Sequence, residues 1–267
     1  DIVPHLHTGL NDLAAQVYQP GYSHFAYVHR GAAGLLAWLI CHDETMLMTG
    51  RDWLTRRDPS FAAVVPQISI YGTGMEERDL SLDDNWQSPG YDDSRWANAR
   101  VVAPLGGYPW MGLQPRPLPL LVEREIPMTL IETRRGPLPP SPDADAHEAL
   151  RRGWTVANLT PVSSDRLRVS RPTAEATTTN WFGIELSSAE AAYYLFDLGR
   201  DYICQGWIEI ESARGEKWVS VSYAEKIRDG ELILSDPETY CRVRMTDRFR
   251  LRTGNQVAET FALRGGR

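Results

Sequence analysis

The sequence predicts an all-β protein built from two antiparallel β-sandwiches of the jelly-roll type. From residue 24 onward the chain reads as short extended runs separated by turn residues, and helical patterns are few. A proline-rich stretch interrupts these runs near the middle of the chain. The length of 267 residues suits about two domains, each large enough to bury its own core.

The first half of the chain contains three candidate strands. HFAYV (24–28) alternates, LLAWLIC (35–41) is a continuous apolar run, and QISIYG (67–72) ends on glycine. Ahead of them, NDLAAQVY (11–18) opens with the N-cap candidates Asn11 and Asp12. This segment is compatible with a helix of two turns, which is too short to organise a helical domain.

The second half repeats the strand pattern more regularly. The candidate strands are YYLFDLG (193–199), GWIEIES (206–212), KWVSVSY (217–223) and DRFRLRTG (247–254). In the third of these, Val219, Val221 and Tyr223 share one face of the strand, because side chains alternate along extended backbone. That face is expected to pack while the opposite face meets water or a neighbour, as in a half-buried antiparallel strand.

The proline-rich stretch RRGPLPPSPDADAHE (134–148) separates the two halves. Its four prolines remove backbone donors and restrict φ, so it resists both sheet and helix. Only DAHEALRR (145–152) is compatible with a short helix here. We therefore expect an N-terminal sandwich over 1–135, a linker or loop over 136–153, and a second sandwich over 154–267 that is truncated at its C-terminal end.

Composition and charge argue against several classes of partner. The formal net charge is −7, and no basic block follows a phosphate backbone, so nucleic acid is not expected. No apolar run reaches the roughly 18 residues that cross a bilayer, so no membrane partner is expected. Cys41, Cys204 and Cys241 are odd in number and far apart, which predicts neither a disulfide framework nor a zinc site. The compartment stays open, with the cytoplasm favoured over secretion.

The segment YDDSRW (91–96) places two carboxylates, a hydroxyl and an arginine between two aromatic residues. Aspartate and serine side chains bond their own backbone in tight turns, so a turn is the favoured interpretation. Calcium is the alternative, with Asp83, Asp92 and Asp93 as candidate ligands. Asp84 and Asn85 lie close by in the sequence, but the spacing does not match an EF-hand. Trp86 and Trp96 flank the turn and are expected to fill a core.

A set of ordered motifs carries a family resemblance. The motifs are NWQSPGYDDSRW (85–96), PWMGLQPRPLPLLVERE (109–125), LFDLGRDYICQGWIEIES (195–212), VSVSYAEKIRDGEL (219–232), RMTDRFRLRTG (244–254) and ETFALRGGR (259–267). Their order resembles the N-terminal sandwich region of bacterial α-L-rhamnosidases, glycoside hydrolase family 78, and related galactose-binding-like domains. The resemblance spans residue 71 to the C-terminus. Ala224 and Phe249 stand where that family usually has glycine and tyrosine.

The resemblance implies a non-catalytic role for this chain. Such rhamnosidases invert configuration with two carboxylates about 6.5–9.5 Å apart, and in the family both lie in an (α/α) barrel that follows the sandwiches. No acid and base pair could be assigned here, so no catalytic residue is named. Glu209 and Glu211 share one strand face, which is typical of a solvated stripe.

Sugar binding is the remaining positive indication. Nine tryptophans and eleven tyrosines exceed what two small cores need, and flat aromatic faces suit the C–H groups of sugars. The best candidate is the loop GGYPWMGLQPRP (106–117), which carries Tyr108, Trp110 and Arg116. Packing of Trp110 in a core or an interface is the competing interpretation.

The sequence therefore supports three hypotheses of different classes. The leading one is an accessory or scaffold region of a rhamnosidase-like glycoside hydrolase, inactive alone, whose partners are the catalytic barrel of the parent chain and a glycan or rhamnoside. The second is a freestanding lectin-like module. The third is a structural or adhesin-type fragment. No cofactor is expected apart from the calcium alternative.

Overall fold

The computed structural model of the chain describes residues 2–25, 27–29, 31–42, 44–65, 67, 72–108, 110–126, 128–137, 160–161, 190–213, 217–228, 231–232 and 245–266. In this part of the chain the regular structure is β-strand with two short 3-10 helices, and there is no α-helix. The prediction of an all-β protein is thus confirmed. None of these described helices is long and apolar enough to cross a membrane.

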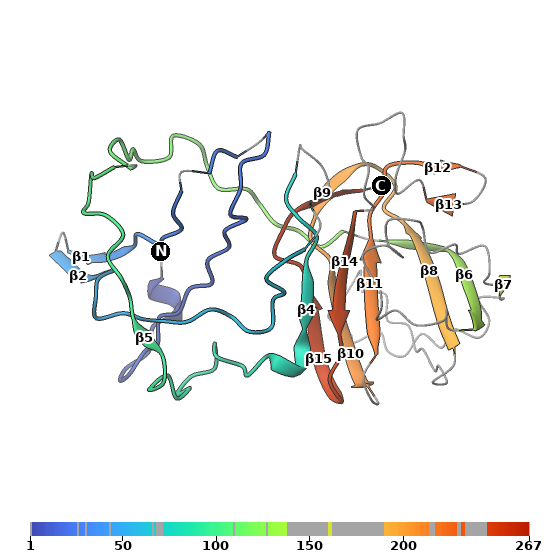
Figure 1. The fold of residues 1–267 in the computed structure, drawn as a ribbon, viewed down its shortest axis with the longest axis horizontal. Helices are drawn as coiled ribbons and strands as arrows, with labels where there is room; N and C mark the ends of the chain where they lie inside the picture. Colours follow the sequence, from blue (N-terminus) through green and yellow to red (C-terminus); the bar gives the residue numbers. More distant parts are fainter. Residues whose placement is uncertain are drawn as a thin grey trace.

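The strands form several small sheets, none of which closes on itself. The helices and strands are η1 (Val3–His5), β1 (Trp38–Cys41), β2 (Glu44–Met48), β3 (Leu54–Thr55), β4 (Glu77–Asp79), η2 (Leu80–Leu82), β5 (Ala97–Asn98), β6 (Thr129–Pro137), β7 (Thr160–Pro161), β8 (Glu190–Asp197), β9 (Tyr202–Cys204), β10 (Trp207–Ala213), β11 (Trp218–Ser222), β12 (Ile227–Arg228), β13 (Glu231–Leu232), β14 (Thr246–Arg250), β15 (Gly254–Glu259) and β16 (Arg264–Gly266). The longer strands stand side by side in the C-terminal part, whereas long irregular segments dominate the N-terminal part (Figure 1).

The C-terminal strands follow the predicted alternation. β10 pairs with β15, and β11 pairs with β14, both antiparallel. Phe249 and Leu251 belong to a buried core, against which Val219 and Val221 of β11 pack. Glu209 and Glu211 point away from this core and are exposed, as expected. Because Phe249 is fully buried, an apolar ring suits this position.

Strand β4 joins this C-terminal sheet although it comes from the first third of the chain. It pairs in parallel with β14, in the sheet order β11-β14-β4. Arg248 and Arg250 of β14 reach across to Glu77 and Asp79 of β4, with N–O distances of 3.2 Å and 3.0 Å. On the other side of β4, the backbone N–H of Asp79 donates to the carbonyl oxygen of Ser60. The parallel register therefore ties an early segment to the late strands.

Several expected elements of the first half differ in the structure. Residues 11–18 adopt no regular structure, so the two-turn helix is wrong; helices this short are marginal without a packed face. HFAYV (24–28) forms only an isolated bridge between His24 and Tyr27, and LLAWLIC contributes only β1. QISIYG (67–72) and DAHEALRR (145–152) lie wholly or mostly outside the described residues.

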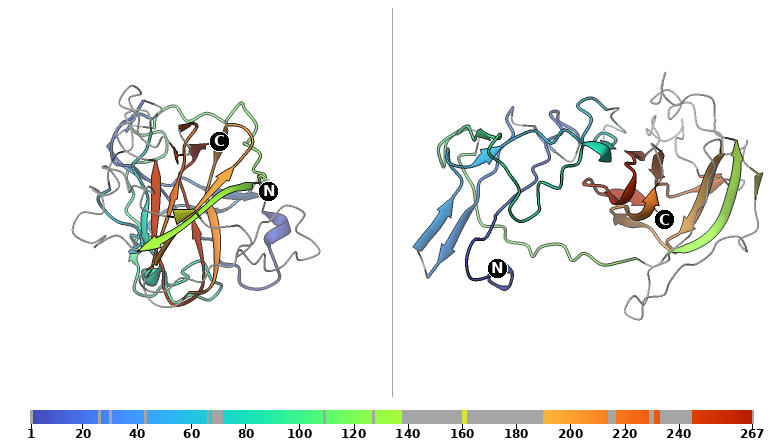
Figure 2. Two further views of the ribbon diagram at one scale, coloured as in Figure 1. Left: turned by 90° about the vertical axis from the view of Figure 1, so that its right-hand side faces the viewer. Right: turned by 90° about the horizontal axis from the view of Figure 1, so that it is seen from below.

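The two predicted sandwich domains are not confirmed as such by these sheets. Gly136 and Pro137, which were placed at the start of the linker, end strand β6 and pair with β8, while residues 138–153 lie outside the described part. The segment that precedes β6 runs in extended form from the N-terminal part toward the C-terminal strands (Figure 2). The three-part division over 1–135, 136–153 and 154–267 stays a prediction.

A buried network of charges connects residues 73–76, which precede β4, with β14 and β16. Arg264 donates to both carboxylate oxygens of Asp247, from Nε at 2.9 Å and from Nη2 at 2.6 Å. It also donates to the Thr73 hydroxyl and the Gly74 carbonyl oxygen. Only 3% of the Arg264 side chain and none of the Asp247 side chain is exposed. A bidentate pair with additional acceptors is the geometry that makes a buried charge tolerable.

Glu76 extends this network. Its backbone N–H donates to Asp247, and its carboxylate accepts the backbone N–H groups of Phe261 and Ala262. Burial raises the pKa of Glu76 above its usual value, and the two backbone donors oppose that shift. The carboxylates of Glu76 and Asp247 thus hold together segments that lie at distant positions in the sequence.

Removing the arginine of the network is expected to destabilise the fold. Arg264→Met leaves the buried Asp247 carboxylate without its ionic partner, so the free energy of unfolding should fall by about 3–5 kcal/mol. Urea denaturation followed by intrinsic tryptophan fluorescence measures this change. Arg124→Met, on an exposed segment, is the matched control and should stay within about 0.5 kcal/mol of the parent protein. Equal stabilities of the two variants would contradict the role of the network.

The raised pKa of Glu76 predicts a defined pH dependence. The folded protein holds this proton more tightly than the unfolded chain, so the contribution of Glu76 to stability is greatest below its ordinary pKa of 4.5 and declines as the pH rises through the raised pKa. Glu76→Gln does not titrate at this position. The free energy of unfolding of Glu76→Gln minus that of the parent protein should therefore increase as the pH rises, by at most about 1.4 kcal/mol per pH unit. Urea titrations of both proteins upward from pH 4.5 test this, and a shift of opposite sign would refute it.

Candidate functional site

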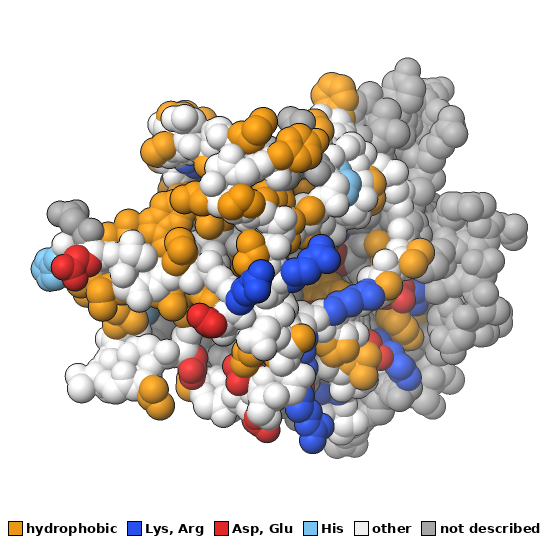
Figure 3. All heavy atoms as spheres, turned by 60° about the vertical axis from the view of Figure 1, so that its left-hand side comes forward, with side chains coloured by type: hydrophobic (Ala, Val, Ile, Leu, Met, Phe, Trp, Pro, Cys, Tyr) orange, Lys and Arg blue, Asp and Glu red, His pale blue; other side chains and the backbone are white. Residues whose placement is uncertain are grey.

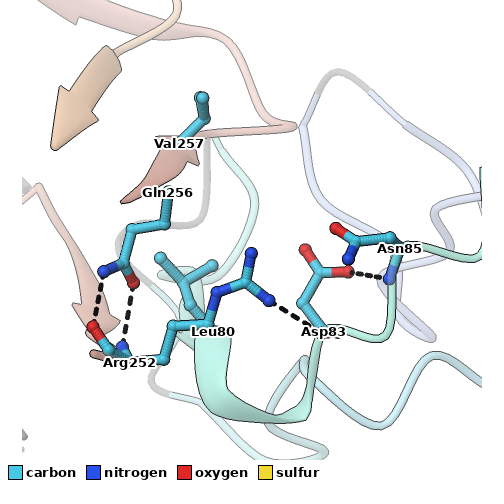
Figure 4. A pocket seen from close by; sticks show the side chains of 6 residues that line it. All are labelled: Leu80, Asp83, Asn85, Arg252, Gln256 and Val257. Atoms are coloured by element: carbon cyan, nitrogen blue, oxygen red, sulfur yellow. Dashed lines mark hydrogen bonds between the residues drawn. The ribbon is translucent and has the colours of Figure 1, made fainter. Parts of the chain in front are cut away.

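A small pocket lies where the early segment meets the late strands. Its volume is about 240 Å³, and its lining residues are Leu80, Asp83, Asn85, Arg252, Gln256 and Val257. One wall comes from η2 and the loop after it, and the other from the turn between β14 and β15 and the start of β15 (Figure 4). The pairing of β4 with β14 brings these two walls together.

The wall from the β14–β15 turn is held by one side chain. The Gln256 amide accepts the backbone N–H of Arg252 at 2.9 Å and donates to the Arg252 carbonyl oxygen at 2.6 Å (Figure 4). It also donates to the carbonyl oxygen of Gly254, whose φ of 98° lies in the left-handed region that favours glycine. These bonds fix the backbone from which the Arg252 side chain extends.

The wall from the early segment is equally well ordered by hydrogen bonds. Asp83 forms an ion pair with Arg78 at 2.8 Å and accepts the backbone N–H of Asn85 at 3.1 Å. Asn85 has a φ of 56°, a left-handed conformation that asparagine tolerates better than most residues. The Arg252 guanidinium reaches across the pocket and donates from Nη1 to the Asp83 carbonyl oxygen at 3.3 Å.

The pocket lining combines polar groups with a small apolar surface. The lining presents the Asp83 carboxylate, the Arg252 guanidinium and two side-chain amides, together with the apolar side chain of Val257 and the edge of Leu80, which is only 1% exposed (Figure 4). Such a mixture of donors and acceptors beside an apolar surface is typical of sites that orient a polar ligand. Asp83 is the one residue of this pocket that the sequence had singled out.

The 91–96 segment forms the predicted turn. Asp92 accepts the backbone N–H of Ser94 at 3.1 Å, and the Asp93 carbonyl oxygen accepts the N–H of Trp96 at 2.8 Å. Interaction with the Ser94 hydroxyl, followed by the bond from the Ser94 backbone N–H, lowers the pKa of the Asp92 carboxyl. The turn interpretation is therefore confirmed.

The calcium alternative gains no support from the geometry around its three candidate ligands. Asp83 pairs with Arg78 in the pocket wall, whereas Asp92 and Asp93 belong to the turn. Across the residues that the structure describes, no three or more histidine, cysteine, aspartate or glutamate side chains are grouped so as to hold a metal ion. Calcium binding stays an untested prediction.

An aromatic and arginine cluster surrounds the turn. The Arg56 guanidinium lies 4.8 Å from the Trp96 ring centroid and 5.7 Å from that of Tyr91. Arg56 also pairs with Asp84 at 2.5 Å, and Asp84 accepts the Tyr91 hydroxyl at 2.6 Å. The Trp86 and Trp96 ring centroids are 6.1 Å apart and both residues are half-buried, so the two rings pack on each other beside the turn. Neither belongs to a buried core cluster of the described residues, so the expectation that they fill a core is not confirmed.

The residues of the 106–117 loop that are expected to contact a sugar are largely accessible. Tyr108 is 76% exposed, Arg116 is exposed and Trp110 is half-buried. A hydrogen bond from the Trp110 N–H to the Gly107 carbonyl oxygen forms a turn. Sugar contact by Tyr108, Trp110 and Arg116 stays a prediction.

The pocket residues Arg252, Gln256 and Val257 were not predicted from the sequence. They lie about 170 positions from Asp83 along the chain, as the separation of 169 for the bond between Arg252 and Asp83 shows. The available signal was the pair of aspartates at 83 and 84, followed by Asn85, but this pattern indicated a metal site rather than a pocket.

Comparisons with known proteins support the fold. No protein-family model and no curated protein sequence matches the chain. Among solved structures, the chain is similar to the GH78 family rhamnosidase of Bacillus sp. GL1, with a TM-score of 0.65 and 16% sequence identity. The similarity covers 92% of this chain and 43% of the rhamnosidase, so the chain spans less than half of that enzyme. At this identity the similarity shows a GH78-like fold.

The Arg56 cluster generates a test of its electrostatics. The hydrogen bond from Arg56, followed by that from Tyr91, lowers the pKa of Asp84 to about 2. Arg56→Met should raise this pKa toward the ordinary value of 3.8, as measured by NMR titration of the side-chain carboxyl carbons. Asp92 is the internal control, because its lowered pKa depends on Ser94. An unchanged Asp84 pKa in the variant would contradict the assignment.

Proposed function

We propose that this chain is a non-catalytic accessory or scaffold region of an α-L-rhamnosidase-like glycoside hydrolase, with glycan contact as a further role. The observation that carries the proposal is the fold similarity, which covers almost the whole chain but less than half of a rhamnosidase. Under this proposal the strands belong to two jelly-roll sandwiches of galactose-binding-like type, and the catalytic (α/α) barrel of the parent chain is the partner.

The two buried carboxylates, Asp247 and Glu76, have surroundings that support a structural role rather than a catalytic one. An inverting glycosidase needs an acid and a base about 6.5–9.5 Å apart, with room for a water molecule between them. Asp247 is instead fully buried against Arg264, and Glu76 is occupied by two backbone donors. Both groups are used to hold segments of the fold together.

The apolar surface of the N-terminal part also supports the proposal. Large side chains are strongly exposed there, including Leu10 at 92%, Phe25 at 81% and Leu120 at 77%. Figure 3 shows apolar side chains gathered over much of this face. Contiguous apolar surface of this kind marks contacts with another domain or protein, which is what a scaffold for a larger enzyme requires.

A freestanding lectin-like module is the second candidate function. The accessible Tyr108 and the polar pocket at Asp83 favour it. The third hypothesis, a structural or adhesin-type fragment, requires that no glycan be retained on an array. The reading frame after Arg267 separates the first two: a barrel sequence there supports the scaffold, and a stop codon supports the module.

The scaffold proposal predicts that the chain alone has no hydrolase activity. The purified protein, incubated with 4-nitrophenyl α-L-rhamnoside, should release nitrophenol no faster than the same protein after heat denaturation. A complete α-L-rhamnosidase serves as the positive control. Nitrophenol release that co-purifies with the protein and is abolished by heat denaturation would overturn the non-catalytic assignment.

A further inference from the structure

We propose that the outward face of strands β10 and β15 is a docking surface for an arginine-bearing segment of another protein. Trp207 stacks on a guanidinium of that partner, and Glu209 and Glu259 pair with its positive charge. The inference goes beyond the proposed function, because it concerns a face of the C-terminal strands and requires neither a rhamnosidase domain nor a glycan.

The register of the two strands brings the residues of this face together. Trp207 lies opposite Glu259, and Glu209 lies opposite Val257, in the antiparallel pair formed by β10 and β15 (Figure 1). Directly opposite residues have Cβ atoms about 4.5–5.5 Å apart, and diagonal neighbours are about 7–8 Å apart. The Trp207 ring therefore has one carboxylate beside it, a second carboxylate two residues along its own strand, and Val257 within reach.

This face points to solvent, because the opposite face of the same strands fills the core. Ile208 of β10 packs against the buried cluster that includes Ala258 of β15, so the residues that alternate with them point outward. Trp207 is 58% exposed and Val257 is 44% exposed. An exposed indole beside a branched aliphatic side chain offers apolar contact area, and tryptophan is enriched in protein interfaces.

The charge of this face has one sign. The outward residues of the two strands carry three carboxylates and no lysine or arginine; they are Trp207, Glu209, Glu211, Asn255, Val257 and Glu259. In the part of the chain that the structure describes, none of these three carboxylates takes part in a hydrogen bond or an ion pair. A second copy of the chain would bring like charges together, so the face suits a cationic partner.

Tryptophan and carboxylate side chains already hold a guanidinium elsewhere in this chain. The Arg248 guanidinium lies 4.2 Å from the Trp218 ring centroid and pairs with Glu77 at 3.2 Å. The Arg56 guanidinium, which lies 4.8 Å from the Trp96 ring centroid, repeats the arrangement with an aspartate. In both places a planar cation combines stacking on the ring with an ion pair.

Trp207 and Glu259 present the same two groups without a cation between them. Among the described residues, no guanidinium lies over the Trp207 ring. Arginine fits this site better than lysine, because its planar group stacks on an aromatic ring while its N–H fork binds a carboxylate. The partner is therefore a protein segment that presents arginine together with apolar side chains.

The experiment measures binding of an arginine peptide to the full chain. The probe is fluorescently labelled Arg-Leu-Arg-Leu-Arg-amide, because alternate side chains of an extended peptide repeat with the spacing of Trp207 and Glu209. Fluorescence anisotropy at low salt should give a dissociation constant of about 100 μM, and binding should weaken as salt is added. The same peptide with glutamate in place of arginine should not bind.

Substitutions on the face test which residues hold the peptide. Trp207→Ala and Glu259→Gln should each weaken binding about two- to fivefold, and the double variant about tenfold. Trp38→Ala, at a tryptophan that is 49% exposed, is the control for the lost ring. Glu123→Gln, at an exposed glutamate, removes the same charge elsewhere and controls for long-range attraction. Both controls should bind like the parent protein, and thermal denaturation verifies that each variant is folded.

Three outcomes would overturn the inference. They are failure of the arginine peptide to bind the parent protein, equal binding by the parent and the double variant, and equal weakening by Glu259→Gln and Glu123→Gln. Sedimentation of the chain alone adds a further check, because a dimer that dissociates in Trp207→Ala would assign the face to a second copy instead. None of these results bears on the scaffold role, which the hydrolysis assay and the reading frame after Arg267 decide.

Discussion

The buried pair between Arg264 and Asp247 is the constraint on which the described fold depends. Both side chains are almost fully removed from water, so either charge without the other would carry a large desolvation penalty. Arg264 also binds the segment at Thr73 and Gly74, and Asp247 binds the backbone of Glu76. The network can form only if residues 73–76, β14 and β16 come together.

That constraint determines the topology around it. With residues 73–76 held against Asp247, the chain that follows runs along β14, and β4 pairs with it in parallel. Leu80 then enters the core beside Phe249, and the loop after η2 is placed opposite the β14–β15 turn. The pocket is therefore a consequence of the same long-range interaction that stabilises the sheet.

The chain has a well-packed C-terminal part and an N-terminal part whose apolar side chains are exposed. The C-terminal strands bury a shared core, whereas the N-terminal part exposes large apolar side chains over long irregular segments. A region of this kind suits a scaffold, because its stable portion supplies rigidity and its apolar face supplies a contact surface.

The alternation of apolar and polar residues in the sequence determined by itself the strands of the second half and the faces that they turn toward the core. The alternation around Val219 and Val221, and of Ile208 and Ile210 with Glu209 and Glu211, follows from the period of two in extended backbone. The 91–96 turn was predictable for a similar reason, since aspartate and serine bond their own backbone. Only the tertiary structure decided the parallel pairing of β4, the absence of a helix at 11–18 and the pocket around Arg252. The pairing of β4 and the pocket depend on contacts between segments far apart in the chain, and local propensity carries no information about such contacts. A two-turn helix at 11–18 would need a packed face that the tertiary structure does not provide.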